Sequence, residues 1–234
     1  MLNALELTGR ARTHVVQRDD LHAALHAEAF QAFMDMNADG ARAGLDIAIS
    51  SGFRDFGAQQ RIWDMKYRGE RPLYDDDGKV LDHVTLSAAA LVEAILSWSA
   101  LPGASRHHWG TELDLIDRAA MPQGYRVQLV PSECAPGGIF NPLHCWLDAN
   151  LARYGFFRPY GTFRGGVRPE PWHVSFAAVA GPALDALTPG VLSEAIDASD
   201  MLGKDVVLRR LPEIYERYVT NVDVLPMKGA GPRT

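Results

Sequence analysis

Two short segments of the chain contain the residue types of a catalytic metal site. The first runs from Ser105 to Asp114 and includes two histidines. The second is Glu170–His173, which begins 56 residues after Asp114. Two imidazoles and one carboxylate match the three protein ligands of a catalytic zinc site, which leaves a fourth position for water. These segments therefore predict a Zn²⁺-dependent hydrolase.

The histidines of the first segment are adjacent, and spacing alone leaves open whether His107 or His108 is the ligand beside Asp114 and His173. Two neutral histidines and one aspartate would leave the zinc site with one net positive charge, which helps to lower the pKa of bound water. The remaining histidines have the ordinary interpretation of surface or satisfied core residues: His14, His22, His26, His83 and His144. On a predicted helix, His22 and His26 share a face but have no third ligand nearby.

A possible base and an anion-binding residue accompany the candidate ligands. Glu170 lies three residues before His173, so it can share the cavity without being a ligand and act as general base and then general acid. Arg54 ends the segment Ser51–Arg54, with Gln59 five residues further on. Its guanidinium could hold a carboxylate or stabilise an oxyanion. Alone, each would be a solvated charge or half of a surface salt bridge, and only their joint occurrence favours a site.

The elements that must position these residues are predicted from the apolar pattern. Alternation predicts strands over 45–50, 112–116 and 172–176. Helical periodicity predicts helices over 21–37 (ended by Asp39-Gly40), 56–68, 85–99 and 141–154, and a mostly helical region over 182–218 with breaks near Pro189-Gly190 and Gly203. Strands and helices do not alternate regularly, so we expect an α+β fold with a small antiparallel central sheet flanked by helices and a helical C-terminal extension.

Composition bounds the function classes. The 234 residues carry a net charge of −6, which argues against nucleic acid as a partner because its backbone attracts basic surfaces. No window approaches the roughly 18 apolar residues of a membrane span. No secretory signal peptide is predicted, so we expect a cytoplasmic location; a missing leader or unconventional export would instead allow periplasmic or extracellular action. Cys134 and Cys145 are expected to be unpaired thiols, with one disulfide as the alternative in an oxidising compartment.

The chain is predicted to form one domain. We expect it to cover residues 1–225, with the motifs in a core over about 45–178, a helical part over 180–220 and a flexible tail over 226–234. The sequence does not indicate an oligomeric state.

Taken together, the motifs resemble a known family. The pattern Ser105-x-His107-x-x-Gly110-x-x-x-Asp114 with Glu170-x-x-His173 is similar to that of the VanY-type D,D-carboxypeptidases. These belong to a wider group of zinc peptidases that includes D-Ala-D-Ala dipeptidases, L,D-carboxypeptidases, phage L-alanyl-D-glutamate endolysins and the hedgehog N-terminal domain. The upstream segment from Ser51 to Gln59 also resembles that family, and the resemblance extends from about Ile47 to Phe176.

The resemblance implies a role for each matched residue. His107, Asp114 and His173 match the zinc ligands, Glu170 matches the catalytic base, and Arg54 matches an arginine that contacts the transition state and the substrate. Three residues match positions assigned to substrate binding: Ser105, Gln59 and Ser51. It also implies a small α+β domain around an antiparallel sheet.

The function that this resemblance implies is hydrolysis of a terminal D-Ala from a peptidoglycan-derived peptide by a zinc carboxypeptidase. An L-alanyl-D-glutamate endopeptidase and a non-catalytic zinc-stabilised binding module are the alternatives; Glu170 argues against the latter, which has no need of a base. The chain departs from the family at Glu112, where a small residue is frequent. This carboxylate is expected either to tune the site, or bind a substrate amine, or to pair with an arginine. The helical region after Ala178 is not explained by the motif.

Overall fold

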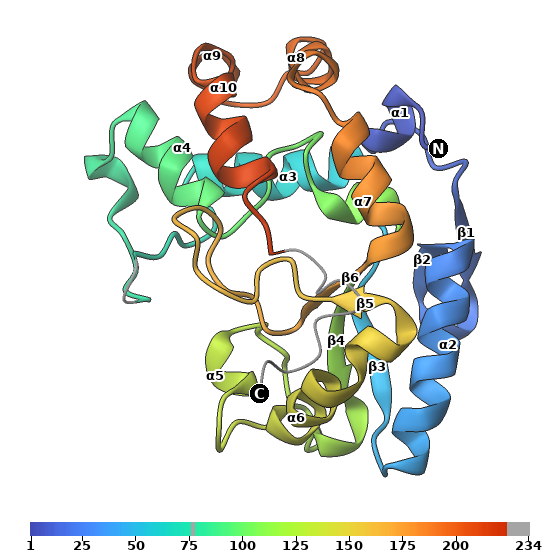
Figure 1. Cartoon of the computed structure of the whole chain (residues 1–234). Coiled ribbons are helices and arrows are strands. Elements are labelled where there is room, and N and C mark those ends of the chain that lie inside the picture. The colour runs from blue at the N-terminus through green and yellow to red at the C-terminus, as the bar shows by residue number, and fades with distance from the viewer. Residues whose placement is uncertain (76–77, 224–234) are drawn as a thin grey trace, which may run out of the picture.

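The computed structural model of the chain describes residues 1–75 and 78–223 (Figure 1). The predicted tail over 226–234 and part of the turn at 75–78 lie outside these residues. The strands are β1 Val15–Arg18, β2 Ala23–His26, β3 Ile47–Ser51, β4 Glu112–Asp117, β5 Phe156–Phe157 and β6 His173–Phe176. The α-helices are α1 Ala4–Leu7, α2 Ala27–Arg42, α3 Phe56–Tyr67, α4 Ala88–Leu96, α5 Pro131–Cys134, α6 Asn141–Asn150, α7 Ala177–Ala186, α8 Pro189–Asp197, α9 Lys204–Arg209 and α10 Leu211–Ile214.

The central sheet has the strand order β3-β4-β6-β5, and each neighbouring pair is antiparallel. Every residue of β4 is buried, as expected for a central strand covered on both faces. A register shift between Ile49 and Ser51 marks an irregularity in β3 next to the site, where bulges re-aim side chains. The predicted α+β architecture with a small antiparallel sheet is confirmed.

The buried apolar side chains form two separate clusters. One contains Phe33 of α2, Leu113 and Leu115 of β4, and Leu143 and Leu147 of α6. Leu113 and Leu115 alternate with Asp114 along β4, so their side chains enter this core while Asp114 faces the other way.

The second core joins α3 and α4 to the C-terminal helices, which lie at the top of Figure 1. Trp63 of α3 is fully buried there, and its indole nitrogen donates to Leu202 O at 2.9 Å. Ile196 of α8 and Ile214 of α10 pack in the same cluster. The helical region that the motif left unexplained therefore completes a hydrophobic core behind α3, the helix that carries Gln59.

The predicted helix over 21–37 is wrong at its start. Residues 23–26 form β2, which pairs antiparallel with β1, and His22 adopts a left-handed conformation at φ 51° in the connecting turn. The helix itself begins at Ala27 and continues past Gly40 to Arg42. His22 and His26 consequently do not share a helix face; the His26 side chain instead caps α2 by accepting from Glu28 N at 3.4 Å.

Other boundaries differ less. The helix predicted over 85–99 is shorter, because Ser87 caps α4 and accepts from Ala90 N. The helix predicted over 141–154 changes to a 3₁₀ turn after Asn150. The predicted break near Pro189-Gly190 is present: α7 ends at Ala186 and Pro189 begins α8, a position where its missing N–H is not needed. The predicted break near Gly203 is also present, since Gly203 caps the start of α9.

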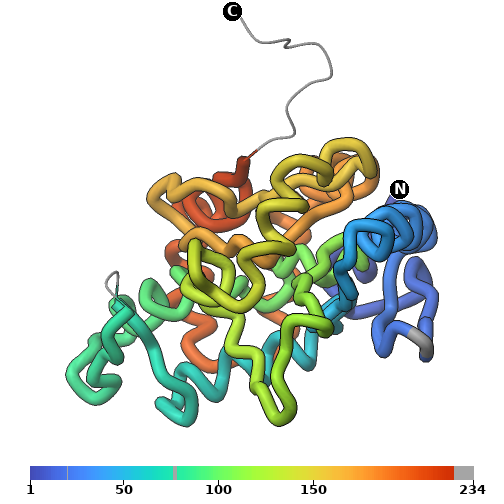
Figure 2. Tube along the Cα trace, turned by 90° about the horizontal axis from the view of Figure 1, so that it is seen from below, coloured from blue at the N-terminus to red at the C-terminus, as the bar shows by residue number. Residues whose placement is uncertain are grey.

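Cys134 is buried and Cys145 is exposed, and both are free thiols, as predicted. Among the described residues, no helix is long and apolar enough to cross a membrane. Viewed from below, α2 lies at one side of the molecule and the chain over residues 78–90 at the opposite side (Figure 2).

Candidate metal centre and active site

The register of the sheet brings three of the predicted site residues into one row. Asp114 of β4 lies opposite His173 of β6 on one side and opposite Ser51 of β3 on the other. Directly paired residues in antiparallel strands share a face of the sheet. Residues that are far apart in the chain thus meet because of strand pairing, on a scaffold more rigid than a loop.

His107 reaches the same face from the 3₁₀ helix Arg106–Trp109, which precedes β4. Gly110 ends this turn in the left-handed conformation, at φ 67°. A Cβ atom there would lie 2.4 Å from Val15 Cγ1, so glycine is required both for the backbone and for the close approach of the β1–β2 hairpin. This explains the Gly110 of the motif in physical terms.

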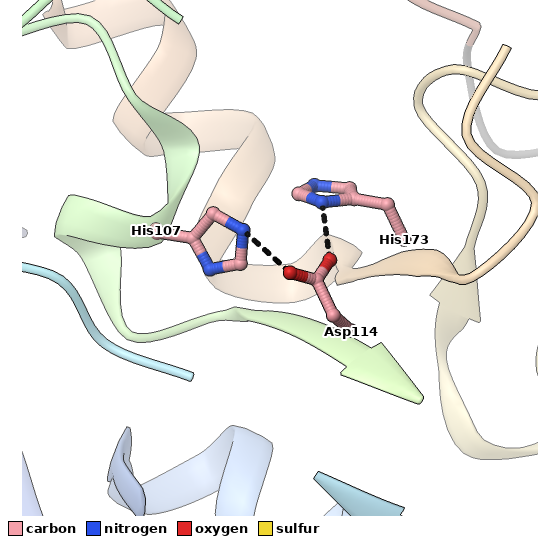
Figure 3. A group of neighbouring side chains, drawn as sticks. All are labelled: His107, Asp114 and His173. Atoms are coloured by element: carbon pink, nitrogen blue, oxygen red, sulfur yellow. Dashed lines mark hydrogen bonds and ion pairs between the residues drawn. The ribbon is translucent and has the colours of Figure 1, made fainter. Parts of the chain in front are cut away.

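His107, Asp114 and His173 point toward one another (Figure 3). His107 Nε2 lies 3.6 Å from Asp114 Oδ2, and His173 Nδ1 lies 3.0 Å from Asp114 Oδ1. One potential ligand atom from each residue lies within 4.8 Å of the others, and all three residues are buried. Two nitrogens and one oxygen at these separations can surround a single cation, and they are the donor types that zinc prefers.

The outward-facing ring nitrogens support a metal site. His107 Nδ1 lies 2.8 Å from Gly52 O, and His173 Nε2 lies 2.9 Å from Glu112 Oε2. Both partners are acceptors, so each outward nitrogen carries a proton. When the rings are neutral, His107 Nε2 and His173 Nδ1 are the lone pairs that face the Asp114 carboxylate and can bind a metal. Hydrogen bonding of the second nitrogen to a carbonyl or carboxylate is the usual arrangement for metal-binding histidines.

The charge balance indicates the same preference for a cation. Burial lowers the pKa of His107 to about 3, so this imidazole stays neutral. Burial also acts to lower the pKa of His173, but hydrogen bonds to Asp114 and Glu112 outweigh it and raise this pKa to about 10. The carboxylates around His173 therefore favour a positive charge at this position. A proton can supply that charge, and a metal ion supplies it when it displaces the proton, as metal binding generally does.

Glu170 lies beside the cluster without belonging to it. Its Oε2 is 3.7 Å from His173 Nδ1, and its side chain is only 16% exposed. Burial raises the pKa of Glu170 to about 7, against the lowering effect of His173. A carboxylate with a pKa near neutrality can accept a proton and return it within one catalytic cycle.

Arg54 is held as a fork by two of the predicted substrate-binding residues. Its Nη1 donates to Gln59 Oε1 at 2.7 Å, and its Nη2 donates to Ser51 Oγ at 2.9 Å. Gln59 is in turn fixed by donating to Ala100 O at 2.7 Å. A guanidinium has five N–H groups, so Arg54 keeps donors for a ligand. Asp114 and Glu170 favour its charged form, although burial lowers the pKa of Arg54.

His108 faces away from the metal cluster. Its Nδ1 donates to Arg54 O at 2.6 Å, and its Nε2 accepts from Gly103 N at 3.1 Å. Of the two adjacent histidines, His107 joins the cluster, whereas His108 ties the Arg54 segment to the neighbouring loop. The structure therefore has His107, and not His108, beside Asp114 and His173.

Glu112 is fully buried beneath the cluster. Besides its contact with His173, it accepts from Ser175 Oγ at 2.7 Å and pairs with Arg106 Nε at 3.3 Å. Arg106 and the hydrogen bonds of His173 and Ser175 lower the pKa of Glu112 to about 2, although burial acts to raise it. Of the alternatives offered for Glu112, the pairing with an arginine is observed.

The site opens into a cavity of about 300 Å³ that all the predicted residues line except Ser51, which reaches it through Arg54. Ser105 is buried in its wall. Several other residues that line the cavity were not singled out from the sequence, among them Lys66, Arg71, Trp98 and Tyr160. Of these four, only Lys66 could have been found from the sequence, because it lies seven residues after Gln59 on a predicted helix and therefore on the same helix face.

Comparison with known proteins places the chain in a family. Residues 22–179 match the family described as VanY, D-alanyl-D-alanine carboxypeptidase. An uncharacterized protein of Haemophilus influenzae is 36% identical over 121 residues, which are 51% of this chain and 92% of that protein. A D-alanyl-D-alanine carboxypeptidase of Enterococcus faecalis is 30% identical over 145 residues, which are 60% of this chain and 44% of that protein.

Solved structures share the fold. VanYB in complex with D-alanine-D-alanine has a TM-score of 0.50 at 24% identity, over 82% of this chain and 92% of that chain. A mutant of the vancomycin resistance D,D-pentapeptidase VanY in complex with Zn(II) has a TM-score of 0.50 at 24% identity, over 79% of this chain and 90% of that chain. The LD-carboxypeptidase LdcB has a TM-score of 0.52 at 19% identity, over 81% of this chain and 80% of that chain. With a family match over more than half of its length, the chain belongs to the VanY D-alanyl-D-alanine carboxypeptidase family.

Proposed function

We propose that the protein is a zinc-dependent carboxypeptidase that removes a terminal D-Ala from peptidoglycan-type peptides. The observation that carries this proposal is the separation of roles in the site. His107, Asp114 and His173 supply three ligand atoms within 4.8 Å of one another, while Glu170 stands next to them as a fourth, non-ligating group. A structural zinc site is closed by four protein ligands, whereas a catalytic site has three and an open position.

His107 Nε2, His173 Nδ1 and an Asp114 oxygen would hold the zinc ion. When bound there, zinc supplies a Lewis acid that polarises the scissile carbonyl and lowers the pKa of water. The relatives bound to Zn(II) and to D-alanine-D-alanine make this metal and this type of peptide the natural candidates.

The remaining residues divide the proton transfer and the charge stabilisation. Glu170 takes a proton from the attacking water and delivers it to the leaving amine, as its raised pKa permits. Arg54, oriented by Ser51 and Gln59, donates hydrogen bonds to the oxyanion or to the terminal carboxylate of the substrate. Ser105, in the wall of the cavity, contacts the substrate.

Defined muropeptides test this proposal when their products are identified by mass spectrometry with and without a chelator. Chelator-sensitive release of free D-Ala is expected. Internal cleavage between L-Ala and D-Glu would instead indicate an endopeptidase. Binding without any product would indicate a recognition module.

A further inference from the structure

The catalytic cavity continues into a second compartment of about 740 Å³, which opens beside Tyr74 and Pro131. Six residues line both compartments: Lys66, Trp98, Gln128, Leu129, Glu170 and Trp172. A peptide that places its scissile bond next to Glu170 can therefore extend past Lys66 into the larger space. Lys66 is the cation that both compartments share.

Lys66 is bound to a hydroxyl rather than to a carboxylate. Its ammonium donates to Ser99 Oγ at 2.6 Å, which is one bond for a group with three donors. Within residues 1–75 and 78–223, Lys66 makes no ion pair, and neither does Arg71, which lines the catalytic compartment nearby. Trp98 Nε1 is a buried donor at the same junction with no acceptor in the described part of the chain.

Buried donors that lack an ion pair or an acceptor favour an anionic ligand. A cation removed from water without an ion-pair partner is costly, and an anion that binds directly to it offsets that cost. Burial lowers the pKa of Lys66 to about 8, while Glu170 raises it and Arg71 lowers it further. The ammonium form accordingly predominates at neutral pH, and a bound carboxylate would stabilise it further.

The geometry of α3 sets the distance between Lys66 and the Arg54 fork. Gln59, Ile62 and Lys66 line the cavity from one face of the helix. At about 1.5 Å of rise per residue, Lys66 lies about 10 Å along the helix from Gln59, the partner of Arg54. An extended peptide advances about 3.3–3.6 Å per residue. The separation thus corresponds to two or three residues, or to one residue with a long side chain.

We propose that Lys66, assisted by Arg71, binds a second carboxylate of the substrate, separate from the negative charge held at Arg54. The preferred substrates are then peptides with an acidic group two or three residues from the scissile end, or at the tip of a long side chain close to it. This inference rests on the proposed carboxypeptidase function and specifies its substrate class.

Two synthetic peptides that differ in one charge test the inference. Both are N-acetylated tripeptides X-D-Ala-D-Ala, in which X is meso-diaminopimelate with its side-chain carboxylate either free or converted to the amide. The wild-type protein is expected to cleave the acid with a kcat/KM about tenfold or more above that of the amide, mainly through KM, as for a charge-assisted hydrogen bond that forms on binding.

Variants assign the preference to Lys66. Lys66→Met is expected to cleave both peptides equally, and Lys66→Arg to retain part of the preference. Arg61→Met is the matched control, because Arg61 is an exposed cation on the same helix that does not line the cavity. Arg61→Met should behave as wild type.

The inference is overturned if the wild type shows no preference for the acid, or if Lys66→Met keeps it while still releasing D-Ala. The proposed function survives either outcome. If neither peptide is cleaved, the proposed function fails instead. The dissociation constants of the two intact peptides, measured by calorimetry on wild type and Lys66→Met, then decide whether Lys66 selects the carboxylate.

Discussion

His173 Nε2 lies 2.9 Å from Glu112 Oε2, and this contact determines which ring nitrogen faces Asp114. Because the Glu112 carboxylate can only accept, the Nε2 position keeps its proton and Nδ1 is available to a metal. Glu112 is in turn held by Arg106 and Ser175. A buried charged network below the cluster therefore sets the tautomer of one ligand above it.

Replacing Glu112 by alanine should weaken zinc binding about 10- to 100-fold, the usual effect of removing such a partner from a ligand histidine. It should also lower the free energy of unfolding of the metal-free protein by about 3–5 kcal/mol, because Arg106 would remain as an unpaired buried charge. Competition with a chromogenic chelator and denaturant unfolding measure the two effects. Glu112→Gln, whose amide oxygen can still accept from His173, should retain more affinity than Glu112→Ala; equal zinc affinity in all three proteins would contradict this role.

Glu170→Gln should bind zinc as tightly as wild type, because Glu170 is not one of the three clustered ligands. Its turnover should fall about 10²- to 10⁴-fold, the typical contribution of a general base. Single-turnover release of D-Ala together with metal analysis measures both quantities. His173→Ala is the comparison, since it should lose the metal itself. Normal hydrolysis by Glu170→Gln would remove Glu170 from the mechanism.

Arg54→Lys should reduce kcat/KM about 10²- to 10³-fold, the loss expected when an oriented donor to developing charge is removed. Lysine keeps the charge but cannot bond Ser51 and Gln59 as a fork while also serving a ligand. Arg118→Lys is a suitable control, because Arg118 also makes two side-chain hydrogen bonds, both to Asp46, but on the surface away from the cavity. If both variants lose the same activity, the orientation of Arg54 has no special role.

Gly110→Ala should destabilise the fold more than the same substitution at a left-handed glycine that has no close neighbours. A Cβ at Gly110 would lie 2.8 Å from the backbone nitrogen of His26 as well as close to Val15. Gly44 has φ 85°, but a Cβ added there would meet nothing within 4 Å, so Gly44→Ala isolates the conformational strain, about 1 kcal/mol. Denaturant unfolding should show an additional loss of about 1–3 kcal/mol for Gly110→Ala. Equal losses of stability in Gly110→Ala and Gly44→Ala would show that the β1–β2 hairpin can move away from the added Cβ at little cost.

The parts of the fold that could be predicted from sequence are those with strong local signals. The alternation of Leu113 and Leu115 with Asp114 identified β4, and Asn141-Pro142 marked the start of α6. The strand at Ala23–His26 was missed because its stability comes from pairing with Val15–Arg18. Leu21 and Leu25 fit a helical period equally well, and periodicity does not report which segment a strand will pair with.

The functional site, like the fold, could be predicted from the sequence only in part. Ligand types and order were visible in the sequence, but the buried environment that raises the pKa of Glu170 was not. Lys66 enters the cavity from α3 and Trp98 from the turn after α4, and only the packed structure brings these two segments together. Their roles depend on missing partners, and an unpaired donor can be recognised only once all its neighbours are known.

Reconstitution of the metal-free protein with zinc tests the central claim most directly. Protein stripped by a chelator and titrated with Zn²⁺ is assayed for release of free D-Ala from a peptide that ends in D-Ala-D-Ala. The activity should be absent at the start and should rise to a plateau at one zinc ion per chain, with no rise for His107→Ala. Full activity in the metal-free protein, or no D-Ala at any zinc concentration, would contradict the account.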